Sequence, residues 1–151
     1  VSMGSWIFQG NPAEFRIDDA IRELDRITWL AKVNLDKMRP GDTVFIWKSI
    51  HNNEPAGIVA KAIMETTWMP ISSPPDVFSY WVDSKKKNTK AKRVWLDIKE
   101  KQSEGHTMIT RDMCLEDDIL KEMLVIRQPN GTNYLLSDNE AEILESIWAE
   151  T

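Results

Sequence analysis

Tryptophan is the residue type in this chain that is best suited to bind a planar ligand. The chain has seven tryptophans in 151 residues, and Trp6, Trp29 and Trp47 stand beside strand and turn signals. A large indole face beside polar groups suits a planar aromatic ligand, such as a nucleobase extruded from a nucleic acid. Indoles also fill protein cores, so the number of tryptophans by itself decides neither role.

Catalytic chemistry finds little support in the sequence. The two histidines, His51 and His106, stand in polar turns far apart, and no HExxH motif or histidine-cysteine cluster is present. The Walker A, GxGxxG and GxSxG motifs are missing as well. Acid pairs such as Asp18-Asp19 stand at expected helix starts, where acids stabilise the N-terminus. We therefore expect a binding domain without catalytic residues, metal or cofactor.

The single cysteine, Cys114, cannot form an intramolecular disulfide or a cysteine-rich zinc site. The acids beside it raise the pKa of a thiol, so a structural role in a reducing compartment is expected. No stretch approaches the roughly 20 apolar residues of a membrane span, and the first residues carry no secretory pattern. These features predict a cytoplasmic protein with no membrane partner.

Positive charge is concentrated in one segment, although the net charge of the chain is −5. Six basic residues and no acid lie between positions 85 and 93: Lys85, Lys86, Lys87, Lys90, Lys92 and Arg93. A basic loop on an acidic body can contact phosphates locally without coating nucleic acid nonspecifically. The alternative is an ordinary solvated loop.

Length and periodicity predict one α+β domain over residues 6–151, with residues 1–5 as a possible leader. Alternating apolar residues predict strands, at residues 6–9, 43–48, 57–64, 93–98 and 132–136. The strand at 57–64 is expected to pair antiparallel with that at 43–48. Helical spacing of apolar residues predicts helices at 17–24 and 115–125, and a Ser137-x-x-Glu140 capping box starts a final helix. Trp6, Trp95 and Trp148 are assigned to the core, and Trp68 is left open.

Several of these segments resemble, in order, the EVE domain family. The matching segments are Trp6-Ile7-Phe8-Gln9-Gly10-Asn11-Pro12, Ile27-Thr28-Trp29, residues 39–49, residues 56–60, and residues 131–136 before Glu140. The resemblance implies a PUA-like fold, which is a bent mixed β-barrel of about five to six strands with flanking helices. It also implies kinship with the YTH, ASCH and SRA-type readers of modified bases.

The resemblance to YTH readers also implies a set of pocket residues. Gln9, Gly10 and Asn11 match the polar turn that hydrogen-bonds the flipped base, and Trp29, followed by Leu30, matches one aromatic wall. Trp47 and Ser49 match the pocket floor, and either Tyr80 or Trp81 matches a second wall. Lys48 points elsewhere and joins the basic loop as an expected phosphate contact.

The leading hypothesis is therefore noncatalytic recognition of a modified base flipped out of duplex DNA. The candidate bases are 5-methylcytosine, 5-hydroxymethylcytosine and N6-methyladenine. The resemblance further implies the targeting domain of a modification-dependent restriction system, with a fused or associated nuclease or AAA+ motor. The alternative is an RNA-binding PUA-like module that recognises modified or structured RNA. An enzyme acting on nucleotides is a third option.

Overall fold

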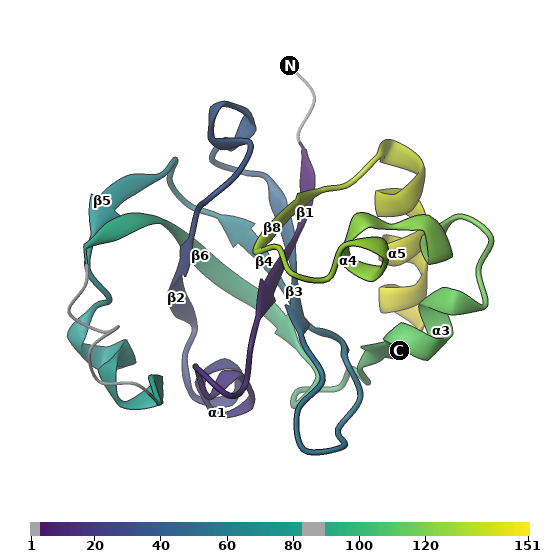
Figure 1. Ribbon diagram of the computed structural model, residues 1–151, viewed down its shortest axis with the longest axis horizontal. Coiled ribbons are helices and arrows are strands. Elements are labelled where there is room, and N and C mark those ends of the chain that lie inside the picture. Colours follow the sequence, from purple (N-terminus) through teal and green to yellow (C-terminus); the bar gives the residue numbers. More distant parts are fainter. Residues whose placement is uncertain (1–3, 83–89) are drawn as a thin grey trace.

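A strongly curved mixed β-sheet forms the centre of the molecule (Figure 1). The computed structural model describes residues 4–82 and 90–151. Six strands follow one another across the sheet in the order β2-β6-β4-β3-β1-β8, and within the described residues β5 adds to β6 and β7 to β4. The strands are β1 (Ser5–Gly10), β2 (Arg26–Leu30), β3 (Thr43–Lys48), β4 (Gly57–Met64), β5 (Met69–Ile71), β6 (Ala91–Lys101), β7 (Ile109–Thr110) and β8 (Asn133–Leu135). The predicted α+β class and curved mixed sheet are confirmed.

Helical segments lie around this sheet. In Figure 1, α3, α4 and α5 gather on one side, whereas α1 lies at the bottom of the view. The α-helices are α1 (Ile17–Glu23), α3 (Arg111–Leu115), α4 (Leu124–Arg127) and α5 (Asp138–Glu150). The 3-10 helices are η1 (Leu35–Lys37), η2 (Pro75–Tyr80) and η3 (Leu120–Glu122). No helix within the described residues is both long enough and apolar enough to cross a membrane.

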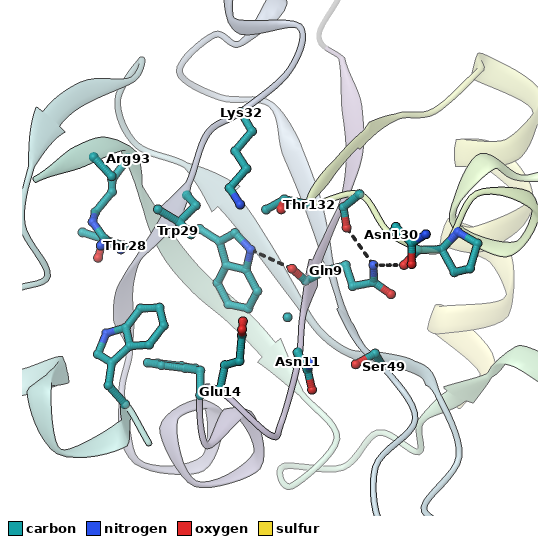
Figure 2. Close-up of a pocket in the computed structure, with 17 residues that line it drawn as sticks. Gln9, Asn11, Glu14, Thr28, Trp29, Lys32, Ser49, Arg93, Asn130 and Thr132 are labelled. Carbon is teal, nitrogen blue, oxygen red and sulfur yellow. Dashed lines mark hydrogen bonds between the residues drawn. The ribbon is translucent and has the colours of Figure 1, made fainter. Parts of the chain in front are cut away.

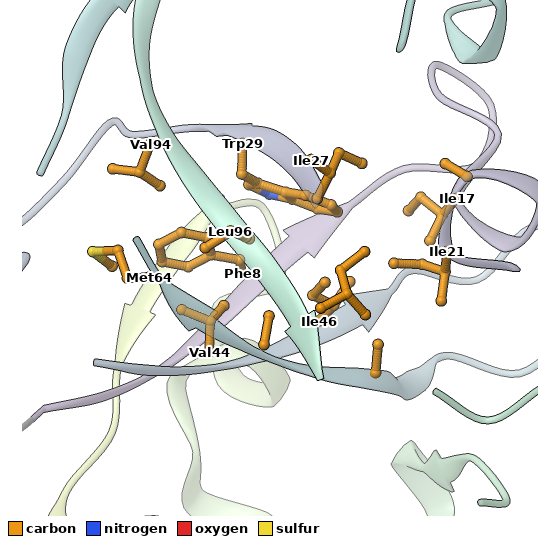
Figure 3. Packing of buried hydrophobic residues seen from close by; sticks show 14 of the residues in the cluster. Phe8, Ile17, Ile21, Ile27, Trp29, Val44, Ile46, Met64, Val94 and Leu96 are labelled. Atoms are coloured by element: carbon orange, nitrogen blue, oxygen red, sulfur yellow. The ribbon is translucent and has the colours of Figure 1, made fainter. Parts of the chain in front are cut away.

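The central strands bury both of their faces, because their side chains alternate between two cores. On β1, Trp6 and Phe8 enter the first core, whereas Ile7 enters the second. Figure 3 shows the first core, where α1 and strands β2, β3, β4 and β6 bring their apolar residues around Phe8. The helices after β7 cover the second core, to which α5 contributes Leu144 and Trp148. As predicted, β4 pairs antiparallel with β3. The structure adds that β1 pairs parallel with β3.

One buried carboxylate ties the starts of β1 and β3 together. Asp42 is 1% exposed, and its Oδ2 accepts hydrogen bonds from Trp6 Nε1 (3.0 Å) and Arg39 N (3.1 Å). Its Oδ1 accepts from Gly4 N at 3.0 Å. Ser5 then opens β1 opposite Thr43. The turn at Gly41-Asp42 therefore fixes the register of the two strands on which the fold is built.

The predicted helix over residues 115–125 is wrong, because the chain breaks there into α3, η3 and α4. The carboxylate of Asp117 accepts from the backbone N–H groups of Ile119 (2.8 Å) and Leu120 (2.9 Å). Such side-chain bonds compete with helix continuation and start a new turn.

The capping box is confirmed: Ser137 Oγ accepts from Glu140 N (3.2 Å), and Glu140 Oε1 accepts from Ser137 N (2.8 Å).

The core assignments hold for two of the three tryptophans. Trp6 and Trp148 are 0% and 1% exposed. Trp95 is half-buried instead, with the Arg26 guanidinium 4.2 Å from its ring centroid, so its assignment to the core is wrong. Trp68 is also partly buried, and it packs against the edge of the first core.

Cys114 is fully buried in the second core. Burial, with a smaller contribution from the charge of Asp117, raises the pKa of its thiol to about 11. The thiol is therefore protonated and inert at neutral pH, as expected for a structural cysteine.

Candidate functional site

A cavity of about 490 Å³ opens where the end of β1, the end of β2 and the start of β6 meet the loop at residues 129–132 (Figure 2). This volume is in the usual range for sites that hold a small planar ligand. Seven of the residues predicted for the pocket line it: Gln9, Gly10, Asn11, Trp29, Leu30, Ser49 and Trp81. The structure therefore gathers predicted residues from four separate regions of the sequence around one cavity.

A glycine at the end of β1 allows Trp29 to lie against that strand. A Cβ atom on Gly10 would come 2.9 Å from Cζ2 of Trp29 and 2.5 Å from Cδ1 of Ile17. In addition, the indole Nε1 of Trp29 donates to the carbonyl oxygen of Gln9 at 3.3 Å. The Trp29 ring is thus held between the first core and the cavity, with 7% of the residue exposed.

Three aromatic rings form the apolar part of the cavity. Phe15 packs edge-on against Trp29, with ring centroids 6.4 Å apart, and against Trp81, with centroids 4.8 Å apart. The indole of Trp81 donates to Ser73 Oγ at 3.1 Å. Trp81 is half-buried, so it has more open surface than Trp29. Rings held in this way offer pre-organised surface for stacking.

Polar side chains face the same cavity. Figure 2 shows Asn11, Glu14, Lys32 and Thr132 around it. The Oδ1 of Asn11 accepts from Ala13 N at 2.9 Å, which orients the amide, and among the described residues the amide nitrogen meets no acceptor. The carboxylate of Glu14 points toward Trp29 in Figure 2. The cavity therefore offers both donors and acceptors to the edge of a planar ligand.

Gln9 braces the cavity rim. Its Nε2 donates to the carbonyl oxygens of Pro129 and Gly131, both at 2.7 Å. The Tyr134 hydroxyl holds the same loop, because it accepts from Gly131 N (2.7 Å) and donates to Gln128 O (2.6 Å). The loop at residues 129–132 is thus tied to β1 and β8, although its residues lie more than 100 positions from Gln9.

Asn133 on β8 ties the other side of the rim in place. It is 3% exposed, its Nδ2 donates to Leu30 O (2.9 Å), and its Oδ1 accepts from Lys32 N (2.7 Å). These bonds fix the end of β2, from which Leu30 and Lys32 reach the cavity. The sequence carries no local signal for this role, since the partners are far away along the chain.

Arg93 lies at the cavity, although the sequence placed it with the basic loop. The residue is 2% exposed, and its Nε donates to Ile71 O at 3.2 Å. The guanidinium carbon lies 5.7 Å from the ring centroid of Trp81. Burial lowers the pKa of Arg93 from its usual value.

Two residues predicted for the pocket do not reach the cavity. Trp47 is 2% exposed and lies in the second core with Phe45, because the alternation of β3 continues through Trp47 and places these two side chains on the same face. Tyr80 is 6% exposed, and its hydroxyl donates to Glu23 Oε2 at 2.6 Å, so Trp81 and not Tyr80 lines the cavity.

Lys48 is also misassigned as a phosphate contact. It is 5% exposed, and its Nζ donates to Asp18 Oδ2 (3.0 Å) and Glu54 Oε2 (3.1 Å). Two carboxylates therefore neutralise the ammonium group, so it is not available to bind a phosphate.

Lys90 and Lys92 are exposed, and the Lys92 Nζ lies 4.9 Å from the ring centroid of Trp68. Lys85, Lys86 and Lys87 lie outside the described residues.

Sequence reasoning missed part of the lining. These residues are Glu14, Phe15, Thr28, Lys32, Ala91 and the loop at 129–132. Glu14 and Phe15 follow the Gln9-Gly10-Asn11 turn so closely that the turn signal could have included them. The Pro-Asn-Gly turn of the loop was visible in the sequence, but its position beside β1 was not.

Comparison with known proteins shows which family and which solved structures share this fold. The EVE domain model matches residues 4–147, and no curated protein matches the chain. A hypothetical protein from Leishmania major has the same fold, with a TM-score of 0.70 and 19% identity over 99% of this chain and 96% of that one.

Two further solved structures agree with this result. A protein from Rhodopseudomonas palustris gives a TM-score of 0.67 at 17% identity, covering 98% of this chain and 94% of that one. Human THYN1, solved in complex with DNA that contains 5-methylcytosine, gives 0.66 at 17% identity, covering 95% and 96%. The family match spans nearly the whole chain and the solved structures share its curved sheet, so this chain belongs to the EVE domain family.

Proposed function

We propose that the protein is a noncatalytic reader of DNA that receives a modified base, flipped out of the duplex, in this cavity. The observation that carries the proposal is the combination of Phe15, Trp29 and Trp81 with hydrogen-bonding groups around one cavity of suitable size. The solved complex of human THYN1 with 5-methylcytosine DNA supports it, because the two chains share a fold.

The energetics of base flipping agree with such a cavity. Extruding a base from a duplex costs a few kcal/mol, and stacking on an aromatic side chain returns about 1–3 kcal/mol per base. Trp81 offers the more open ring, whereas Trp29 closes the cavity from the core side. Stacking on these rings together with edge hydrogen bonds offsets the cost of flipping.

Asn11 and Glu14 are the proposed readers of the base edge. A carboxylate accepts from the exocyclic amine of cytosine, and an amide group can both donate and accept. Both residues line the cavity, and the Glu14 carboxylate points toward Trp29 in Figure 2. We therefore favour 5-methylcytosine or 5-hydroxymethylcytosine, whose amine Glu14 would receive, with N6-methyladenine as a further candidate.

The basic segment provides the proposed contacts to the flanking phosphates. Lys90 and Lys92 are exposed just before and within the start of β6, whose Ala91 and Arg93 line the cavity. Phosphate contacts strengthen binding without reading sequence. In the cell, such a reader would target a fused or associated nuclease or AAA+ motor to modified DNA, as in a modification-dependent restriction system.

Fluorescence anisotropy with labelled duplexes tests the proposal. The duplexes would carry one plain, 5-methylated or 5-hydroxymethylated cytosine, or one N6-methyladenine. We expect the wild-type protein to bind one modified duplex at least tenfold more tightly than the plain one. Trp81→Ala should lose this selectivity because its stacking surface is gone.

Trp95→Ala is the matched control. It removes another half-buried tryptophan that stacks with an arginine but lies outside the cavity, so it should keep the selectivity. Equal weak binding to all duplexes would refute the proposal. Tighter binding to structured or modified RNA than to every duplex would favour an RNA-binding module instead.

A further inference from the structure

The Arg93 guanidinium is unusual among the buried cations of this protein. Within residues 4–82 and 90–151, three cationic side chains are buried: Lys48, Arg93 and Lys101. Lys48 contacts two carboxylates, and Lys101 lies 3.4 Å from Asp25 Oδ1. Arg93 has no carboxylate within hydrogen-bonding or ion-pair distance in this part of the chain.

Part of the Arg93 guanidinium has no partner among the described residues. Its single hydrogen bond to a described residue runs from Nε to Ile71 O, so the two Nη groups carry donors that described residues leave unused. The residue lines the cavity, and its guanidinium lies beside the Trp81 ring. A buried charge without a counterion is unfavourable for folding, unless a ligand supplies the opposite charge.

The Nη edge of arginine is a planar fork that matches a carboxylate or a phosphate in a bidentate way. We propose that the ligand presents an anionic oxygen group to Arg93 inside the cavity. This inference rests on the proposed function. Two sources share this chemistry: a carboxylate on the modified base, as in 5-carboxylcytosine, and the phosphate of the flipped nucleotide itself.

The other charges of the cavity set the orientation of such a ligand. Figure 2 shows Arg93 and Glu14 on different sides of the cavity, with Lys32 above Trp29. An anionic group is repelled by the Glu14 carboxylate and attracted by Arg93, whereas an exocyclic amine prefers Glu14. A cytosine derivative satisfies both residues when its exocyclic amine faces Glu14 and its anionic oxygen group, either a carboxylate on the neighbouring ring carbon or the phosphate of the nucleotide, faces Arg93.

Two binding comparisons distinguish the sources. The first compares duplexes with 5-carboxylcytosine and 5-methylcytosine. The second compares a 5-methylcytosine duplex with the same duplex in which a neutral methylphosphonate replaces the phosphate on either side of the modified base. A base carboxylate predicts at least tenfold tighter binding in the first comparison, and a phosphate predicts at least tenfold weaker binding of the methylphosphonate duplex in the second.

Arg93→Gln should abolish whichever difference the wild-type protein shows, and Arg93→Lys should restore little of it because lysine lacks the planar fork. Arg26→Gln is the matched control, since this exposed arginine stacks on Trp95 outside the cavity. It should leave both comparisons unchanged. Thermal melting of Arg93→Gln should show a melting temperature equal to or above that of the wild type, because this change removes a buried charge that has no counterion among the described residues.

The inference is overturned if neither comparison shows a difference, or if Arg93→Gln and Arg93→Lys both keep it. In that case, selectivity for a modified over a plain duplex that still depends on Trp81 would leave the proposed function standing. Loss of all selectivity between modified and plain duplexes in the wild-type protein would overturn the two together.

Discussion

Gly10 stands where β1 ends, and its missing side chain leaves room for two groups from elsewhere in the fold. Ile17 approaches from α1, and Trp29 approaches from β2. This position requires small size and not backbone freedom, because Gly10 is not among the residues with a positive φ angle in the described part of the chain. One hydrogen atom in place of a side chain therefore sets the position of an aromatic wall.

Gly10→Ala adds one methyl group and tests whether the small size of Gly10 sets the position of Trp29. Overpacking against Ile17 and Trp29 should lower the free energy of unfolding by about 1–3 kcal/mol and weaken binding of the preferred duplex. Urea unfolding and anisotropy measure the two effects. The double variant Gly10→Ala/Ile17→Val removes the Cδ1 atom of the closest contact and should recover part of the stability. A single variant as stable as the wild type would show that Trp29 is not held by this contact.

At the scale of secondary-structure elements, a few side chains connect the strands that carry the site. Asp42 links β1 to the turn before β3, and Asn133 links β8 to the end of β2. Both residues are buried, and each accepts or donates several hydrogen bonds. The elements around the cavity are therefore held by polar contacts as well as by apolar packing.

Asp42→Ala should destabilise the protein through this linkage. The change leaves the Trp6 indole N–H and two backbone N–H groups without their acceptor in a buried setting. We expect a loss of about 2–4 kcal/mol in the free energy of unfolding, measured by urea denaturation. Asp36→Ala is the control, because Asp36 is exposed on η1 and should have little effect. Equal effects of the two variants would contradict the role assigned to Asp42.

At the scale of the whole molecule, charge is distributed unevenly. The net charge is −5, yet residues 85–93 carry six basic residues and no acid. Within the described part of this segment, Ala91 and Arg93 line the cavity. An acidic body with one basic segment favours local contact with phosphates over nonspecific coating. Affinity for DNA should therefore depend on salt through few contacts.

The double variant Lys90→Gln/Lys92→Gln tests this distribution. Each lost phosphate contact should reduce the slope of log K against log salt by about 0.9, so the double variant should lose about 2. Selectivity between modified and plain duplexes should remain, because phosphate contacts carry no base information. Lys121→Gln serves as the control, since Lys121 is exposed on η3 and pairs with Asp118. An unchanged slope in the double variant would place the phosphates elsewhere.

Local sequence alone determined much of this protein. Alternation predicted the central strands, the Ser137 capping box predicted the last helix, and the ordered motifs predicted the family and the Gln9-Gly10-Asn11 turn. These features follow from neighbouring residues, because strand faces and helix caps depend on side chains within a few positions.

Only the tertiary structure decided which side chains face the cavity. Trp81 lines the cavity and Tyr80 does not, and Trp47 and Lys48 are buried elsewhere. Glu14, Arg93 and the loop at residues 129–132 come together around the cavity. The physical reason is that the second core around Trp47, the ion pairs of Lys48 and a loop held by a distant glutamine all depend on partners far along the chain. The residue types capable of binding a base were therefore visible in the sequence, whereas their assembly into one cavity depended on long-range packing.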